Sequence, residues 1–268
     1  MCESGHPITE WIDGRQRRLT LRFIHEEPLS IRVQGIPYVV VMRTPGDEIA
    51  HVAGFCLSEG LIDHPEQMVN LAMCDGDDTN VVTVTLTPER RRQVSGHLDR
   101  RGYISQTSCG LCGKTLIDEL HQSLLPIDDA TTIHPGPAEQ CLRSLDQFQP
   151  LRRSSAASHA AALYDKDLNL LVAMEDVGRH NALDKAIGRL FLDRQLHLAK
   201  VLVMSSRISY ELVQKAARAQ IPIIIAYSRP TDLAINLSTR LNITLAGDAR
   251  PTGLYLYCNT HRFDLRNE

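Results

Sequence analysis

Apolar and polar positions alternate along much of the N-terminal half of the chain, a pattern that is typical of β-strands. Residues 18–23 and 80–86 alternate one by one, and residues 36–42 are rich in β-branched and aromatic side chains. A turn at 44–47 precedes apolar residues at helical spacing, which predicts a helix from Asp47 to about Leu61 with Asp47 as its cap. We therefore expect an N-terminal β-rich subdomain that also contains a helix.

The second half of the chain alternates predicted strands with predicted helices. Apolar runs at 168–174, 200–204 and 221–227 are each followed by a polar loop and a helical pattern, and two shorter strands at 243–245 and 254–257 flank a turn. Such alternation implies parallel β-α-β units, so we predict the α/β class with a three-layer sheet core. Ligands of such sheets collect where strands end and helices begin.

Length and composition allow a substantial core, because 43% of the 268 residues are hydrophobic. Residues 126–137 are rich in Pro, Asp, Thr and Gly and are the best candidate for a linker. We predict a mixed α+β region over 1–127 and an α/β cofactor-binding region over 128–268, either as two regions or as one compact unit. The net charge of −3 gives no electrostatic argument for binding nucleic acid or an anionic membrane.

The location of the protein is predicted from its N-terminus and its cysteines. The chain has no apolar run long enough to span a bilayer and does not begin like a secretory signal, so we expect a cytoplasmic protein. Seven scattered cysteines are an odd number, which argues against a disulfide framework. The roles that remain for these cysteines are reduced thiols, a metal site or catalysis.

The most informative stretch of the chain is a glycine-flanked loop that contains Cys109 and Cys112. A helical pattern follows at 115–125, so the pair lies at or just before a helix N-terminus. Unpaired amide groups and the positive end of the helix dipole favour a thiolate there, and Lys114 adds a nearby cation. The loop is therefore suited to a reactive sulfur.

The cysteine pair is compatible in principle with four roles. A structural zinc site needs four ligands, and no second pair with matching spacing is present. A thioredoxin-like redox pair normally follows a strand, but residues 102–107 make a poor one. Inert buried cysteines do not fit the polar, glycine-containing surroundings. The remaining use is a cysteine nucleophile that carries sulfur as a persulfide, which needs an accessible loop and a lowered thiol pKa.

Three further loops carry polar groups at predicted strand ends. Residues 175–181 combine two carboxylates, an Arg and a His, and residues 205–207 offer hydroxyls and an Arg to an anion such as phosphate. Helix capping and surface ion pairs are the alternative for both. Residues 247–253 are either a plain turn or a grip for a nucleotide through Arg250 and backbone amides. His159 stands alone, which is more typical of a structural histidine than of a base.

Five ordered groups of motifs give the chain a resemblance to a known family. They are MRTPGDE at 42–48 with GFCLSEG at 54–60, SCGLCG at 108–113, EDVGRHNALDK at 175–185, SYELVQKA at 209–216, and PTDLA at 230–234. Together they resemble the FdhD/NarQ family over roughly residues 20–262. Five motifs in the same order are far more specific than a single C-x-x-C.

The resemblance implies a sulfurtransferase that serves formate dehydrogenase. Members take persulfide sulfur from a cysteine desulfurase and pass it to the molybdenum or tungsten bis(molybdopterin guanine dinucleotide) cofactor, which is a bound acceptor. They form homodimers and have a cytidine-deaminase-like core, and no permanent metal is predicted. The partners expected are therefore a cysteine desulfurase, formate dehydrogenase and a second copy, but neither nucleic acid nor a membrane.

The resemblance also assigns candidate residues. The persulfide cysteine falls on Cys109, and Cys112 is expected to assist by tuning the thiol pKa, resolving a mixed disulfide or relaying sulfur. The cofactor-binding stretch falls on Asp248, Ala249, Arg250, Pro251, Thr252 and Gly253. Arg179 and Arg207 are further candidate phosphate contacts.

Two alternatives from other classes stay open. A non-catalytic chaperone would bind the same cofactor and deliver it without moving sulfur. A zinc deaminase-like hydrolase would need His-x-Glu followed by Pro-Cys-x-x-Cys, and this chain has neither a His-x-Glu near the pair nor a proline before Cys109.

Overall fold

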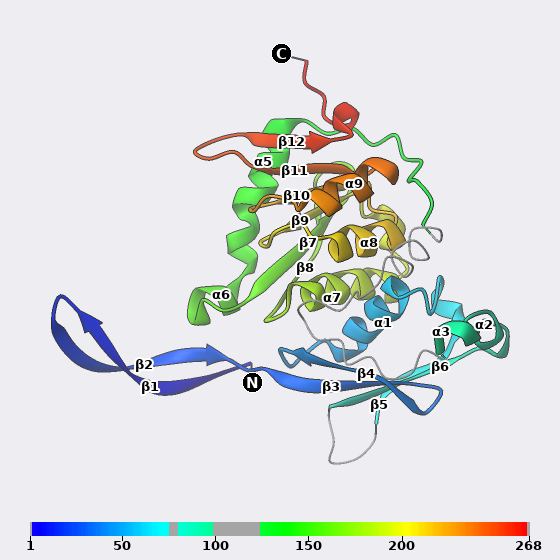
Figure 1. The fold of residues 1–268 in the computed structure, drawn as a ribbon, viewed down its shortest axis with the longest axis horizontal. Helices are drawn as coiled ribbons and strands as arrows, with labels where there is room; N and C mark the ends of the chain where they lie inside the picture. Colours follow the sequence, from blue (N-terminus) through cyan, green and yellow to red (C-terminus); the bar gives the residue numbers. More distant parts are fainter. Residues whose placement is uncertain (1, 75–79, 99–123, 267–268) are drawn as a thin grey trace.

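A computed structural model describes residues 2–74, 80–98 and 124–266 (Figure 1). Its largest sheet has six strands in the order β12-β11-β10-β9-β7-β8. The strands are β7 (His159–Tyr164), β8 (Leu170–Asp176), β9 (Val201–Met204), β10 (Ile223–Ala226), β11 (Thr244–Asp248) and β12 (Leu254–Cys258). β9, β10 and β11 are parallel, whereas β7 and β12 run antiparallel to their neighbours.

Helices cover both faces of this sheet. α7 (Arg179–Leu192), α8 (Tyr210–Arg218) and α9 (Asp232–Arg240) lie on one face, and α5 (Pro135–Ser144) lies on the other (Figure 1). β9 and β10 read VLVM and IIIA because both of their faces are buried. The predicted α/β class with a three-layer core is confirmed.

The N-terminal part is β-rich, as predicted. A four-stranded sheet has the order β4-β3-β6-β5, and β1 pairs with β2 in a separate two-stranded ribbon. The strands are β1 (Glu3–Ile12), β2 (Arg15–Ile24), β3 (Glu27–Val33), β4 (Ile36–Arg43), β5 (Met68–Met73) and β6 (Val81–Leu86). The short helices are α2 (Pro88–Gln93), α3 (Ser95–Leu98), α6 (Pro150–Ser155) and the 3-10 turns Pro65–Gln67, Leu145–Phe148, Leu196–Leu198 and Thr260–Arg262.

Helix α1 (Glu48–Ser58) connects the two sheets by packing against α7. The helices cross at glycines: a Cβ at Gly188 would lie 1.8 Å from the carbonyl oxygen of Ala50, and one at Gly54 would lie 1.9 Å from that of Asp184. Only glycine fits at both positions. One hydrophobic core includes side chains from both halves of the chain, among them Leu29, Val52, Leu183 and Leu202.

Two local expectations differ from the structure. Asp47 precedes α1 but has a left-handed backbone with φ 58° and makes no side-chain cap hydrogen bond. The segment 126–137 is packed against the body rather than free, because Ile127 and Ile133 are buried and Ile133 pairs with Phe263. None of the helices in the described part of the chain combines the length and apolar character needed to cross a bilayer.

Candidate functional site at the edge of the six-stranded sheet

Most of the predicted binding residues lie along one edge of the six-stranded sheet. β8 runs in the same direction as β9, β10 and β11 because β7 is antiparallel to both β8 and β9. The carboxyl ends of these four strands and the amino ends of β7 and β12 therefore share one edge. Arg179 follows β8, Arg207 follows β9, and the turn 248–253 joins β11 to β12. This is the edge at which ligands of α/β sheets bind.

The two carboxylates at the end of β8 are structural. Glu175 accepts hydrogen bonds from the backbone N–H groups of Leu151 and Arg152, at the start of α6, and from the Ser158 hydroxyl. A carboxylate at a helix N-terminus satisfies amides that have no partner within the helix. Glu175 therefore holds α6 against the strand that leads into the candidate site.

Asp176 fixes the loop that carries Arg179. Its carboxylate accepts from the backbone of Thr44 at 3.0 Å and Gly178 at 2.9 Å, and from the Asn181 amide at 2.9 Å. Lys185 Nζ lies 2.8 Å from the same carboxylate. Because Thr44, Asn181 and Lys185 are buried together with Asp176, the loop has little freedom, and the first turn of α7 is presented in one orientation.

Arg179 is the centre of a cluster of cationic side chains. Burial lowers the pKa of Arg179 and the charge of Arg207 lowers it further, whereas the Glu211 carboxylate acts in the opposite direction. The Nε atom of Arg179 is buried without a hydrogen-bond partner. In the described part of the chain, neither arginine has a carboxylate within ion-pair distance. An anion between them would relieve the repulsion and supply acceptors.

His159 belongs to the same cluster, although the sequence favoured a structural role for it. Burial lowers the pKa of His159, and the charges of Arg179 and Arg152 lower it further. Its Nδ1 atom is buried and has no hydrogen-bond partner. No motif around His159 points to this placement, because it arises from β7 lying between β8 and β9 in the sheet.

His180 is turned toward α8 and meets an acidic partner there. Its Nε2 atom lies 2.8 Å from Glu211 Oε2, and this close approach holds the pKa of Glu211 below its ordinary value. Glu211 was not among the predicted site residues. The SYELVQKA motif contains it, so the sequence offered a signal that was not assigned a role.

The other end of the edge is centred on Asp248, whose side chain is buried. Burial acts to raise the pKa of Asp248, but hydrogen bonds from Arg250 and Arg143 outweigh it and leave the pKa below its ordinary value. The Oδ atoms lie 2.7 Å from Arg250 Nε and 2.7 Å from Arg143 Nη2. Arg143 was missed by the sequence analysis because it comes from α5, far from Asp248 in the chain. Arg229 lies over the Tyr255 ring beside this turn.

The structure brings the predicted residues together in two groups rather than one. Arg179 and Arg207 form the first group, and Asp248 with Arg250 forms the second. β8 and β11 are separated by β7, β9 and β10, which is four strand spacings or roughly 19 Å. One ligand would have to be long to contact both ends of the edge.

The cysteine pair Cys109 and Cys112 lies outside the described residues, so its predicted catalytic role is not placed relative to this edge. Five other cysteines are described, and all are free thiols. Burial raises the pKa of Cys56, Cys141 and Cys258, so these three are poor sources of a thiolate.

Comparisons with known proteins identify relatives over most of the chain. The chain is 39% identical to the "Sulfur carrier protein FdhD" of Streptomyces avermitilis over 255 residues, which covers 91% of this chain and 89% of the relative. It is 36% identical to the protein of the same name from Mycolicibacterium paratuberculosis, covering 97% of this chain and 98% of the relative.

A solved structure supports the fold. A formate dehydrogenase accessory protein from Desulfotalea psychrophila superimposes with a TM-score of 0.78 at 22% identity, covering 98% of this chain and 100% of that chain. The model of the FdhD/NarQ family matches residues 24–264. The chain therefore belongs to the FdhD/NarQ family, as the ordered motifs predicted.

Proposed function

We propose that this protein carries sulfur as a persulfide on Cys109, from a cysteine desulfurase to the molybdenum or tungsten cofactor of formate dehydrogenase. The observation that supports this most directly is that relatives covering about nine-tenths or more of the chain are named sulfur carrier proteins, while the chain itself has a cysteine loop suited to a thiolate. The name of the Desulfotalea psychrophila protein supports formate dehydrogenase as the client.

The loading step is a thiol–disulfide type exchange. The Cys109 thiolate attacks the outer sulfur of the donor's persulfide, a new S–S bond forms on Cys109, and the donor leaves as a thiolate. One S–S bond forms as the donor's S–S bond breaks, so no external oxidant is needed. Reduced thiols are required throughout, which supports the cytoplasm as the location.

The acceptor is proposed to bind along the edge of the six-stranded sheet. The cofactor is long and carries phosphates, which suits arginines placed along an edge where the first strand, β8, and the last, β11, lie roughly 19 Å apart and β9, which precedes Arg207, lies midway. Its guanine-nucleotide end would lie at residues 248–253, with Arg207 and Arg179 as phosphate contacts further along the edge. Because members of this family form homodimers, we also propose that the protein pairs with a second copy of its own chain.

The cysteine assignment is tested by sulfur labelling. After incubation with a cysteine desulfurase and cysteine, mass spectrometry should show a gain of one sulfur on wild-type protein. The gain should disappear in Cys109→Ala and persist in Cys74→Ala, a control at an exposed thiol. A gain that survives Cys109→Ala would overturn the assignment, and a Cys109→Ala protein that still activates formate dehydrogenase would favour a non-catalytic chaperone.

The acceptor site is tested with GDP. Calorimetry should detect binding that is weakened about tenfold by Arg207→Ala, the loss expected for one charge-assisted phosphate contact. Arg194→Ala, at an exposed arginine beyond the far end of α7, is the matched control and should leave binding unchanged. Absence of binding at millimolar GDP would count against the proposed edge.

A further inference from the structure

Arg229 lies beside Arg207 at the edge of the six-stranded sheet where the candidate site is found. β9 and β10 are parallel neighbours, and their register continues beyond their ends to an isolated parallel bridge between Ile208 and Pro230. Arg207 and Arg229 are the residues directly before this bridge, so they occupy matching positions on adjacent segments of the chain. Neighbouring strands are about 4.8 Å apart, and the two backbone positions are separated by roughly that distance.

Basic residues occur at this edge on four strands in succession. Arg179, Arg207 and Arg229 are each the third residue after their strand, which is β8, β9 and β10 respectively. His159 begins β7, which lies between β8 and β9 and is antiparallel to both, so it reaches the same edge. The sheet order therefore places them in the sequence Arg229, Arg207, His159, Arg179. Arg229 stands between the first group of site residues and the turn 248–253, because β10 lies between β9 and β11.

The charge of Arg229 is available to a ligand, unlike the charges of its neighbours at the turn. Arg143 and Arg250 each lie 2.7 Å from the buried carboxylate of Asp248. Arg229 is exposed, and among the described residues no carboxylate lies within ion-pair distance of it. A phosphate at Arg143 or Arg250 would have to compete with Asp248, whereas a phosphate at Arg229 would not.

The Tyr255 ring orients the Arg229 guanidinium. Cζ of Arg229 lies 5.8 Å from the centroid of the Tyr255 ring, which is within the range of a cation–π contact. Tyr255 is near the start of β12, opposite Gly247, and its side chain is 48% exposed. A ring against the face of a guanidinium leaves the N–H groups free, because they lie in the guanidinium plane. Arg229 is thus held in place without losing the donors that a phosphate needs.

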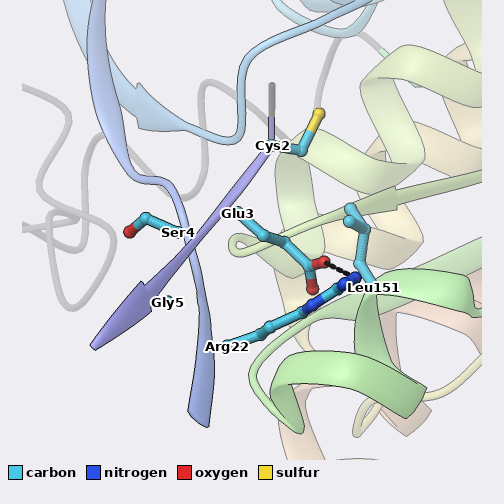
Figure 2. Close-up of a pocket in the computed structure, with 6 residues that line it drawn as sticks. All are labelled: Cys2, Glu3, Ser4, Gly5, Arg22 and Leu151. Carbon is cyan, nitrogen blue, oxygen red and sulfur yellow. Dashed lines mark ion pairs between the residues drawn. The ribbon is translucent and has the colours of Figure 1, made fainter. Parts of the chain in front are cut away.

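An arginine beside a pocket elsewhere in the protein shows the contrast. A pocket of about 390 Å³ lies between the base of the β1–β2 ribbon and α6, and Figure 2 shows Arg22 there, beside Glu3. Glu3 Oε2 lies 4.0 Å from Arg22 Nη1, and the Ser154 hydroxyl donates to the same carboxylate. A phosphate in this pocket would meet the negative charge of Glu3. The pocket therefore lacks the unpaired cations that distinguish the edge of the six-stranded sheet.

We propose that Arg229 and Arg207 bind the diphosphate of the acceptor's guanine-nucleotide end, with Tyr255 as the positioning residue of Arg229. The base lies at residues 248–253, so Arg229 contacts the phosphate next to the nucleoside and Arg207 contacts the phosphate beyond it. Two cations at matching positions on adjacent strands fit two linked phosphates, whereas a single phosphate needs only one of them. This assignment rests on the acceptor site proposed above and names the chemical group that two of its arginines recognise.

Titration calorimetry with GDP and GMP tests the order of the two arginines. Wild-type protein should bind GDP about tenfold more tightly than GMP. Arg229→Ala should weaken the binding of both nucleotides about tenfold, whereas Arg207→Ala should weaken GDP binding about tenfold and leave GMP binding unchanged. Arg194→Ala, at an exposed arginine that pairs with Glu66, is the control and should bind both nucleotides like wild type. Circular dichroism of each variant shows whether it is folded.

The outcomes separate this assignment from the acceptor site itself. If Arg207→Ala weakens GDP binding but Arg229→Ala binds both nucleotides like wild type, the role of Arg229 is overturned and the acceptor site stands. A loss of GMP binding in Arg207→Ala but not in Arg229→Ala would overturn the proposed order. A wild-type protein that binds no GDP at millimolar concentration would count against the acceptor site as well.

The role of Tyr255 is tested by a double-mutant cycle. Tyr255→Phe keeps the ring and should bind GDP like wild type, whereas Tyr255→Leu should weaken GDP binding about threefold, the usual effect of an exposed cation–π contact. In an Arg229→Ala background, Tyr255→Leu should have no further effect, because the residue that it orients is already absent. An equal loss in both backgrounds would show that Tyr255 acts on the nucleotide directly and would overturn its role as a positioning residue.

Discussion

Lys185 Nζ lies 2.8 Å from Asp176 Oδ2, and both side chains are almost completely buried. Lys185 also donates to the carbonyl oxygen of Thr44 at 2.8 Å, while the Thr44 N–H donates to Asp176. The pair thus ties the segment before α1 to the loop that carries Arg179. A buried ion pair that is fully hydrogen-bonded specifies one geometry, and the loss of either partner leaves an uncompensated charge.

We therefore predict that Lys185→Met lowers the free energy of unfolding by about 3–5 kcal/mol, the usual cost of breaking a buried pair from one side. Chemical denaturation monitored by circular dichroism measures this change. Lys166→Met is the control, because Lys166 pairs with Asp167 at an exposed position, and its stability should match wild type. A Lys185→Met protein as stable as wild type would show that Asp176 is held by its other donors alone.

A second prediction concerns the crossing of α1 and α7. Gly188→Ala places a methyl group where the carbonyl oxygen of Ala50 already lies, so the helices must separate. The expected loss is about 1–3 kcal/mol of stability or more, as for other overpacked cores. Gly136→Ala, in α5, meets no atom within 4 Å and should not destabilise the protein. Equal melting temperatures for the two variants would contradict the close crossing.

The sequence predicted the second half of the fold well, because its strands are either short apolar runs or flank a clear turn. β9, β10, β11 and β12 lie within a few residues of the predicted ranges. β7 was not predicted, since its three consecutive alanines have little strand propensity and its position is determined by burial between β8 and β9. β1 was missed despite a usable signal, the Asp13–Gly14 turn between alternating residues.

The candidate site was predictable only where its residues follow a strand. Arg179 and Arg207 were assigned because they come after predicted strands, and the sheet order brings them together. Arg143 and His159 could not be assigned, because each reaches the edge from an element whose place in the sheet or against it is set by tertiary packing. Local patterns contain no information about such packing.

A third prediction uses the repulsion between Arg179 and His159. Because the Arg179 charge lowers the pKa of His159, Arg179→Gln should raise that pKa toward the ordinary histidine value, and burial should keep it below. NMR titration of the His159 ring measures the shift. Arg153→Gln is the control, since Arg153 lies on the same short helix as Arg152 but does not act on His159. An unchanged His159 pKa in Arg179→Gln would show that the two side chains do not interact and that His159 does not belong to the cationic cluster.

A fourth prediction concerns stability in mild acid. Burial lowers the pKa of His51 well below its ordinary value, and the charges of Lys185, Lys215 and Arg43 lower it further. The unfolded chain therefore binds a proton near pH 6.5 that the folded chain does not, so stability is present above that pH and is lost as the pH falls below it. One such group contributes a slope of up to about 1.4 kcal/mol per pH unit. His51→Leu replaces the imidazole by an apolar side chain of similar size that does not titrate, so the unfolding free energy of the variant should fall less steeply between pH 6.5 and pH 5 than that of wild type. His197→Leu, at an exposed position, should keep the wild-type slope. Parallel curves for wild type and His51→Leu would show that the acid sensitivity comes from other groups, of which His159 is the next candidate because its pKa is also lowered.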